Sequence, residues 1–210
     1  MAFLEGWALN DMSPRYRLFR RVMRALGAFF FGFEVHGEEN VPEKGPLIVA
    51  ANHCRFFDPV FVSMAVPRRL RWMAKKELFA FPFGRFFAFL GAFPVDRKSG
   101  GRAALRIALG FLAEGRTLGI FPEGTRRKGG VSLEAKSGTA LLAARSGAPV
   151  VPVFVGKIPS PVARLCGEKF LVYIGDPMTI DNRAKGRDGY RRMADKVLRT
   201  IYALPEERVW

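Results

Sequence analysis

The sequence predicts an α/β fold in which a mixed, largely parallel sheet is flanked by helices. Short apolar runs, such as residues 47–51 and 150–155, alternate with longer stretches whose apolar residues recur at helical spacing. Strands that alternate with helices usually pair in parallel, because each helix returns the chain to the same end of the sheet. Of the 210 residues, 49% are hydrophobic, which is enough to build the full core of one domain.

The first expected element is an amphipathic helix that begins at Ser13 and Pro14, with the serine as N-cap and the proline in the first turn. Its apolar residues recur at spacings of three and four: Leu18, Phe19, Val22, Met23, Leu26, Phe29, Phe30 and Phe33. Its basic residues fall largely on the other side: Arg17, Arg20, Arg21 and Arg24. This pattern favours a helix lying in the membrane interface over a surface helix packed on the domain. We therefore divide the chain into an N-terminal amphipathic membrane-docking segment, residues 1–32, and a domain of residues 33–210.

The remaining elements follow from the same spacing rules. Strands are expected at residues 33–36, 47–51, 70–74, 93–95, 117–121, 150–155 and 169–175. Helices are expected at residues 59–66, 86–90, 101–114, 137–146 and 190–203. Gly115 and Gly147 each stop a helix, because glycine readily adopts the left-handed conformation that ends one. No apolar run reaches the ~18–20 uninterrupted residues that a membrane-spanning helix needs.

The charge of the chain is strongly positive, at +15 from 34 Lys and Arg against 19 Asp and Glu. Such an excess attracts nucleic acid, acidic lipid headgroups and phosphorylated substrates alike, and a solvated basic face is the plainer alternative. The sequence carries no zinc-ligand cluster, no RNA-recognition signature and no helix-turn-helix pattern. Twenty phenylalanines shift the balance toward lipid. We expect a lipid bilayer as partner, and neither nucleic acid nor a metal ion.

Cysteine usage and the N-terminal residues bear on the compartment. Cys54 and Cys166 are the two cysteines of the chain and give no disulfide framework, so a reducing cytosolic setting fits them best. The first dozen residues carry Glu5 and Asp11 without a basic stretch before an apolar core, which is not the pattern of a secretory signal. Together with the amphipathic segment, these features predict a peripheral, monotopic protein on the cytoplasmic face of the cell membrane.

The most informative motif lies at the end of the strand expected at 47–51, where His53 and Asp58 stand five positions apart. An imidazole that a carboxylate holds in one tautomer acts as a general base toward a hydroxyl near neutral pH. A lone histidine is more often a hydrogen-bonded core residue. Two further segments, residues 91–97 and 121–126, give the motif its force, because each follows or contains another expected strand.

These segments resemble, in the same order, the motifs of the glycerolipid acyltransferase family, specifically the bacterial 1-acyl-sn-glycerol-3-phosphate acyltransferases. Residues 52–58 match the first block, 91–97 the second and 121–126 the third, while 150–153 are similar to the apolar-proline fourth block. At one position the chain departs from the family, since Arg55 stands where a serine is usual.

The resemblance implies transfer of a fatty acyl group from an acyl thioester to the 2-hydroxyl of lysophosphatidate, which gives phosphatidate. The donor would be acyl carrier protein or coenzyme A, both acidic, used as a co-substrate without any cofactor. Two alternatives remain open. One is the same acyl transfer to another lyso-acceptor or to glycerol-3-phosphate, an alternative that the departure at Arg55 leaves open. The other is a non-catalytic basic protein that binds lipid or RNA.

Residue roles follow from the chemistry and the resemblance together. His53 would be the general base and Asp58 would orient it, so that the acceptor hydroxyl attacks directly. The substrate-binding candidates are Lys75, Arg97, Glu123, Gly124, Thr125 and Arg126. Of these, Arg126 is the leading phosphate ligand and Arg97 the next, because a guanidinium makes bidentate contacts to phosphate oxygens. The Phe-rich run at 79–93 is the best candidate for lining an acyl-chain groove.

Overall fold

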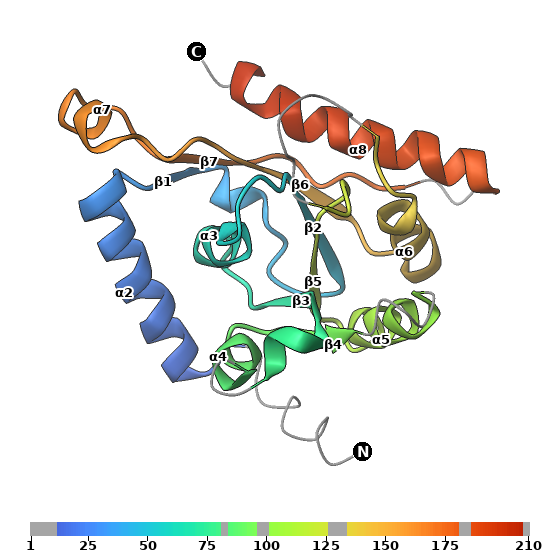
Figure 1. Ribbon diagram of the computed structural model, residues 1–210. Coiled ribbons are helices and arrows are strands. Elements are labelled where there is room, and N and C mark those ends of the chain that lie inside the picture. The colour runs from blue at the N-terminus through green and yellow to red at the C-terminus, as the bar shows by residue number, and fades with distance from the viewer. Residues whose placement is uncertain (1–11, 81–83, 96–100, 126–133, 181–185, 208–210) are drawn as a thin grey trace.

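A seven-stranded sheet forms the centre of the computed structural model, which describes residues 12–80, 84–95, 101–125, 134–180 and 186–207 (Figure 1). The strands are β1 Glu34–His36, β2 Leu47–Ala51, β3 Leu70–Lys75, β4 Ala92–Val95, β5 Thr117–Ile120, β6 Val150–Val155 and β7 Leu171–Ile174. Their order across the sheet is β1-β7-β6-β2-β5-β3-β4. Neighbouring strands pair in parallel except β6 and β7, which are antiparallel. The mixed, largely parallel sheet expected from the sequence is thus confirmed.

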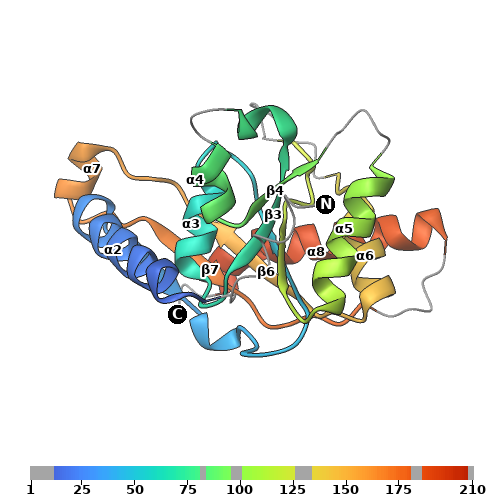
Figure 2. The ribbon, with the colours of Figure 1, turned by 90° about the horizontal axis from the view of Figure 1, so that it is seen from below.

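Helices cover both faces of this sheet. They are α2 Pro14–Phe31, α3 Asp58–Ala65, α4 Gly84–Phe89, α5 Arg102–Ala113, α6 Gly138–Ser146, α7 Pro161–Leu165 and α8 Arg187–Glu207, with short 3-10 helices η1 Glu38–Asn40 and η2 Lys76–Phe79. Helices α2, α3 and α4 pack on one face, and α5, α6 and α8 pack on the other (Figure 2).

The central strand β2 is buried on both faces, which explains its unbroken apolar sequence. Side chains alternate along a strand, so Leu47, Val49 and Ala51 enter the core under α3, whereas Ile48 and Ala50 enter the core under α5, α6 and α8. All five residues are buried. This strand therefore gives the residues that follow it a rigid base.

The helices that the sequence pattern missed are short. Helix α7 has five residues, too few to show a helical period, although its Ser160 N-cap accepts a hydrogen bond from the backbone N–H of Ala163. Helix α8 extends beyond the expected 190–203 at both ends and holds Pro205 within its last turn. The other expected elements occur within a few residues of their predicted bounds.

Helix α2 begins as the sequence predicts and ends at Phe31, so that Phe33, the last residue of the expected stripe, lies outside the helix. The side chain of Ser13 accepts a hydrogen bond from the backbone N–H of Tyr16, and Gly32 closes the helix with a φ of 61°. Tyr16 is buried against Phe89, with the guanidinium of Arg69 over its ring. These contacts attach the first turn of α2 firmly to the domain.

Of the four arginines predicted to form the basic side of α2, Arg20 and Arg24 face the domain, whereas Arg17 and Arg21 are exposed. Arg20 and Arg24 both form ion pairs with Glu38, at 2.5 and 2.8 Å. Arg20 also donates to the backbone carbonyls of Met64 and Ala65 at the carboxyl end of α3, where the helix dipole favours a cation. Tertiary partners that the sequence pattern does not reveal therefore decide the orientation of the helix.

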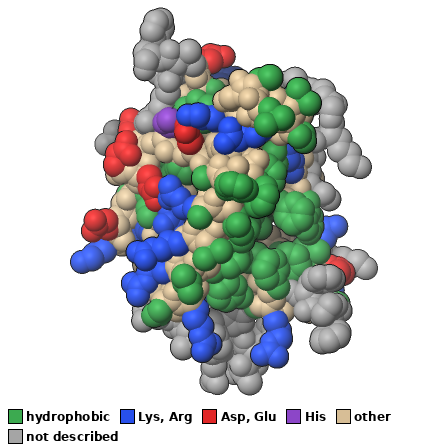
Figure 3. All heavy atoms as spheres, turned by 90° about the vertical axis from the view of Figure 1, so that its left-hand side faces the viewer, with side chains coloured by type: hydrophobic (Ala, Val, Ile, Leu, Met, Phe, Trp, Pro, Cys, Tyr) green, Lys and Arg blue, Asp and Glu red, His purple; other side chains and the backbone are tan. Residues whose placement is uncertain are grey.

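The apolar side of α2 consequently faces outward. Its exposed residues are Leu18, Val22, Leu26, Phe29 and Phe30. Figure 3 shows hydrophobic side chains gathered on this face of the molecule, with basic side chains beside them. Phe29 alone is 77% exposed, far more than an aromatic side chain in a core. Among the described helices, none combines the length and the apolar character needed to cross a membrane.

Candidate active site

The site is built where β2 ends, between β5 and β6. Asn52, the first residue after the strand, is almost fully buried. Its side-chain carbonyl accepts from the backbone N–H of Val155, and its amide donates to the carbonyl of the same residue. The end of β2 is thus fixed to the end of β6, and His53 follows directly.

His53 and Asp58 form a hydrogen-bonded pair, with 3.1 Å between Nδ1 and Oδ2. Asp58 is only 1% exposed and is the first residue of α3. Its Oδ2 also accepts from the backbone N–H groups of Cys54 and Arg55, both at 2.6 Å. These donors and the helix N-terminus stabilise the ionised carboxylate.

This arrangement fixes the proton on the imidazole. An ionised carboxylate only accepts hydrogen bonds, so Nδ1 of His53 carries the proton that it shares with Asp58. The lone pair then lies on Nε2, which has no hydrogen-bond partner among the described residues. The pair can therefore take a proton at Nε2 and hold the resulting imidazolium beside a buried anion.

An aromatic stack supports the imidazole from one side. The His53 ring stacks on Phe121 with centroids 4.0 Å apart, and Phe121 stacks on Trp72 at 4.9 Å. Trp72 is itself fixed, because its indole N–H donates to the hydroxyl of Ser63. A side chain at Gly119 would place its Cβ 2.7 Å from the Trp72 ring. Sequence analysis missed Trp72, although a glycine inside the expected strand at 117–121 was a signal of close approach.

Glu123 is a further polar residue that the structure brings to the end of β2. Its Oε1 accepts from the backbone N–H of His53 at 3.4 Å and from the hydroxyl of Tyr202 at 2.6 Å. Glu123 is 9% exposed, and within the described residues its buried Oε2 has no hydrogen-bond partner. Tyr202 lies on α8, 79 residues away in sequence, so local spacing gave no signal of its role.

The other substrate-binding candidates lie at the edge of the site or outside the described residues. Gly124 has a φ of 72°, which suits a glycine in a tight turn, and Thr125 next to it is exposed. Lys75 is exposed at the end of β3, on the same edge of the parallel sheet. Arg97 and Arg126 lie outside the described residues. In the described part of the chain, no cluster of three His, Cys, Asp or Glu side chains is arranged to hold a metal ion.

Apolar aromatic residues gather close to His53. Phe56 and Phe57 are exposed and pack edge-to-face at 5.2 Å. Phe56 also contacts Phe87, which in turn contacts Phe79 and Phe86. Part of the Phe-rich run expected to line an acyl groove therefore meets Phe56, which lies between His53 and Asp58 in the sequence and was not included in that prediction.

Cys54 and Arg55 lie between His53 and Asp58 in the sequence. Desolvation of the thiol, followed by the charges of Asp58 and Glu123, raises the pKa of Cys54 above its ordinary value although the residue is exposed. A protonated thiol is a poor nucleophile. The guanidinium of Arg55 donates to the carbonyl of Gly156 and lies 3.8 Å from Oδ1 of Asp58.

Comparison with known proteins gives a consistent result. The family described as Acyltransferase matches residues 32–156. The 1-acyl-sn-glycerol-3-phosphate acyltransferase of Bacillus subtilis is 30% identical over 165 residues, which cover 78% of this chain and 82% of the relative. The Streptococcus pneumoniae protein of the same name is 29% identical over 177 residues, covering 82% and 66% of the two chains. In fold, the chain is similar to the crystal structure of the 1-acyl-sn-glycerophosphate acyltransferase of Thermotoga maritima, with a TM-score of 0.67, 23% identity and coverage of 99% of this chain and 87% of that one.

Proposed function

The chain belongs to the acyltransferase family, and on that premise we propose that it is a 1-acyl-sn-glycerol-3-phosphate acyltransferase. It transfers a fatty acyl group from an acyl thioester to the 2-hydroxyl of lysophosphatidate and releases phosphatidate. The observation that carries the proposal is the imidazole of His53, whose Nδ1 a buried Asp58 holds and whose Nε2 stays available for a substrate hydroxyl.

The reaction follows from this geometry in two steps. The acceptor hydroxyl gives its proton to Nε2 of His53 while its oxygen attacks the thioester carbonyl, which forms a tetrahedral oxyanion. The intermediate then collapses, the carbon–sulfur bond breaks, and the leaving thiolate takes the proton back from the imidazolium. Asp58 stabilises the imidazolium between the two steps. No covalent acyl-enzyme is needed, in line with the raised pKa of Cys54.

The acceptor is held by its phosphate and its glycerol. We assign the phosphate to the turn at Gly124 and Thr125 together with Arg126 and Arg97, with Lys75 as a further cation at the same edge. The unpartnered Oε2 of Glu123 is suited to accept a hydrogen bond from a glycerol hydroxyl, because a buried carboxylate oxygen without a donor is costly to leave unpaired.

The enzyme acts on amphiphiles, and we propose that it works as a peripheral, monotopic protein at the cytoplasmic leaflet. The exposed apolar side of α2 supports this, because Phe29 and Phe30 have nothing to cover them in the described structure. Arg17 and Arg21 are exposed on the same helix and are available to anionic headgroups, whereas Arg20 and Arg24 pair with Glu38.

Purified protein incubated with acyl-carrier-protein and coenzyme A thioesters and a panel of acceptors tests the proposal. Lysophosphatidate should be acylated at its 2-hydroxyl with a kcat/KM well above that for other lyso-lipids or for glycerol-3-phosphate. Faster turnover of another acceptor would move the assignment to that lipid, and Arg55 would be the first residue to exchange for serine. Binding of lipid without turnover of any acyl thioester would contradict the proposal.

A further inference from the structure

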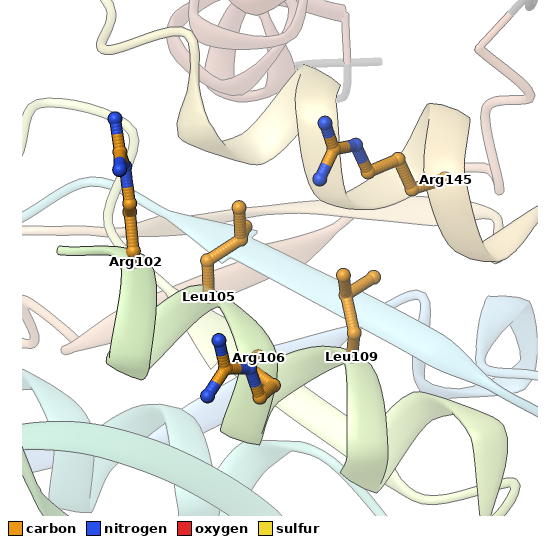
Figure 4. A pocket seen from close by; sticks show the side chains of 5 residues that line it. All are labelled: Arg102, Leu105, Arg106, Leu109 and Arg145. Carbon is orange, nitrogen blue, oxygen red and sulfur yellow. The ribbon is translucent and has the colours of Figure 1, made fainter.

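A groove lined by three arginines and two leucines lies between α5 and α6, on the face of the sheet opposite α2. Its volume is about 410 Å³, and its lining residues are Arg102, Leu105, Arg106, Leu109 and Arg145. Figure 4 shows both leucines pointing into the space between the two helices, with Arg145 reaching over it from α6. None of these residues belongs to the site around His53.

The spacing of the four residues from α5 places them along one side of the helix. Positions 102, 105, 106 and 109 follow the i, i+3, i+4, i+7 pattern and span about 10 Å at 1.5 Å per residue. Arg102 and Arg106 form one row and Leu105 and Leu109 the next, while Arg145 lies across the groove. An apolar row thus runs between guanidinium groups, and these have no ion-pair partner among the described residues.

We propose that this groove docks an acidic amphipathic helix of acyl carrier protein, the donor that presents the acyl thioester. The inference rests on the proposed function, since it names the carrier for that reaction. Carboxylates on either side of an apolar row in the partner would meet the arginines, and its apolar residues would cover Leu105 and Leu109.

The shape of the groove favours a protein over the nucleotide of coenzyme A. Its charges are spread along a helix instead of converging on one point, and none of the five lining residues is aromatic to stack on an adenine ring. Helix α5 begins after β4, whose end lies level with the end of β3 in the parallel register. Arg102, at the start of α5, therefore lies toward the same edge of the sheet as His53.

Charge reversal tests the docking surface. The triple variant Arg102→Glu, Arg106→Glu, Arg145→Glu should lower kcat/KM for acyl-acyl carrier protein roughly ten- to a hundredfold and weaken its dependence on salt, because electrostatic steering is lost. Turnover of acyl-coenzyme A should stay close to wild type. Arg199→Glu, an exposed arginine on α8, is the matched control and should change neither donor.

Each other outcome overturns the proposal. An equal loss with both donors would place the groove in coenzyme binding or in the fold, and an unchanged kcat/KM for acyl carrier protein would remove it from donor recognition. A wild-type enzyme that uses acyl-coenzyme A alone would also contradict it. Failure of the proposed function is separate, because the wild type would then form no phosphatidate with either donor.

Discussion

The strand-end site and helix α2 place polar and apolar groups in opposite ways. At the site, Asp58 and Glu123 are buried carboxylates. Asp58 accepts a hydrogen bond from the backbone N–H of Cys54, and Glu123 accepts one from the hydroxyl of Tyr202. On α2, Arg20 and Arg24 turn toward the domain and the phenylalanines turn outward. A buried charge is costly unless it is paired, and an exposed phenylalanine is costly unless something covers it. The His53–Asp58 pair is therefore held by groups within the chain, whereas the apolar side of α2 is left uncovered by the described residues.

The largest effect is expected from a substitution that inactivates the site and leaves α2 unchanged. His53→Ala removes the general base, so kcat should fall by ~10²–10⁴-fold with both substrates saturating. Vesicle binding should be unchanged, since His53 does not belong to α2. Steady-state kinetics and vesicle flotation on the same preparation separate the two regions. A large fall in flotation would show that membrane binding by α2 depends on the site around His53.

The converse experiment removes the apolar side of α2. The pair Phe29→Ser and Phe30→Ser should weaken binding to anionic vesicles about a hundredfold, at roughly 1.5 kcal/mol for each phenylalanine withdrawn from the bilayer. Activity on a short-chain soluble acceptor should persist. These point variants are cleaner than deletion of residues 1–31, which would also remove the buried contacts of Tyr16. Unchanged flotation would place the docking surface elsewhere.

A smaller effect is expected at Tyr202, which links α8 to the site. Tyr202→Phe leaves Oε1 of Glu123 without its 2.6 Å donor. The KM for lysophosphatidate should rise about tenfold, because a hydrogen bond to a charged group is lost. The KM for the acyl donor should change little. In the Glu123→Gln background the same substitution should have a reduced effect, and an undiminished effect there would assign Tyr202 to the core instead of to the orientation of Glu123.

The smallest effect concerns the attachment of α2. Burial alone would raise the pKa of Glu38, but the hydrogen bonds and charges of Arg24 and Arg20 outweigh it and lower the pKa below its ordinary value of 4.5. A lowered pKa in the folded state means that the contribution to stability is present above pH 4.5 and is lost as the pH falls through the folded value. Glu38→Gln should therefore reduce the free energy of unfolding by about 1 kcal/mol at neutral pH. The difference from wild type should shrink in acid, as denaturant unfolding at several pH values would test.

Elements with a local sequence signal lie where they were predicted. The strands β2 and β6 have their predicted bounds, because buried parallel strands read as unbroken apolar runs. His53 and Asp58 meet as expected because five residues close into a turn at the start of α3. When the interacting residues lie within one turn of the chain, their spacing in the sequence is enough to predict their contact.

What sequence analysis missed depends on contacts between distant segments. Tyr202 reaches Glu123 across 79 positions, and Trp72 reaches His53 only through Phe121. The orientation of α2 depends on ion pairs with Glu38. Because Glu38 lies outside the helix, the apolar spacing within the helix gives no information about it. The apolar spacing of residues 101–114 predicted only a helix, because the groove forms only where α6 lies beside α5.

The central claim is that Asp58 acts through His53, so that the two residues work as one unit. The most direct test compares kcat of His53→Ala with kcat of the double variant His53→Ala, Asp58→Asn. Asp58→Asn alone should lower kcat steeply, because the amide favours the wrong imidazole tautomer. Once His53 is gone, the second substitution should lower kcat no further, within about twofold, since residues that act as a unit are not additive. A double variant as slow as the product of the two single losses would contradict the account.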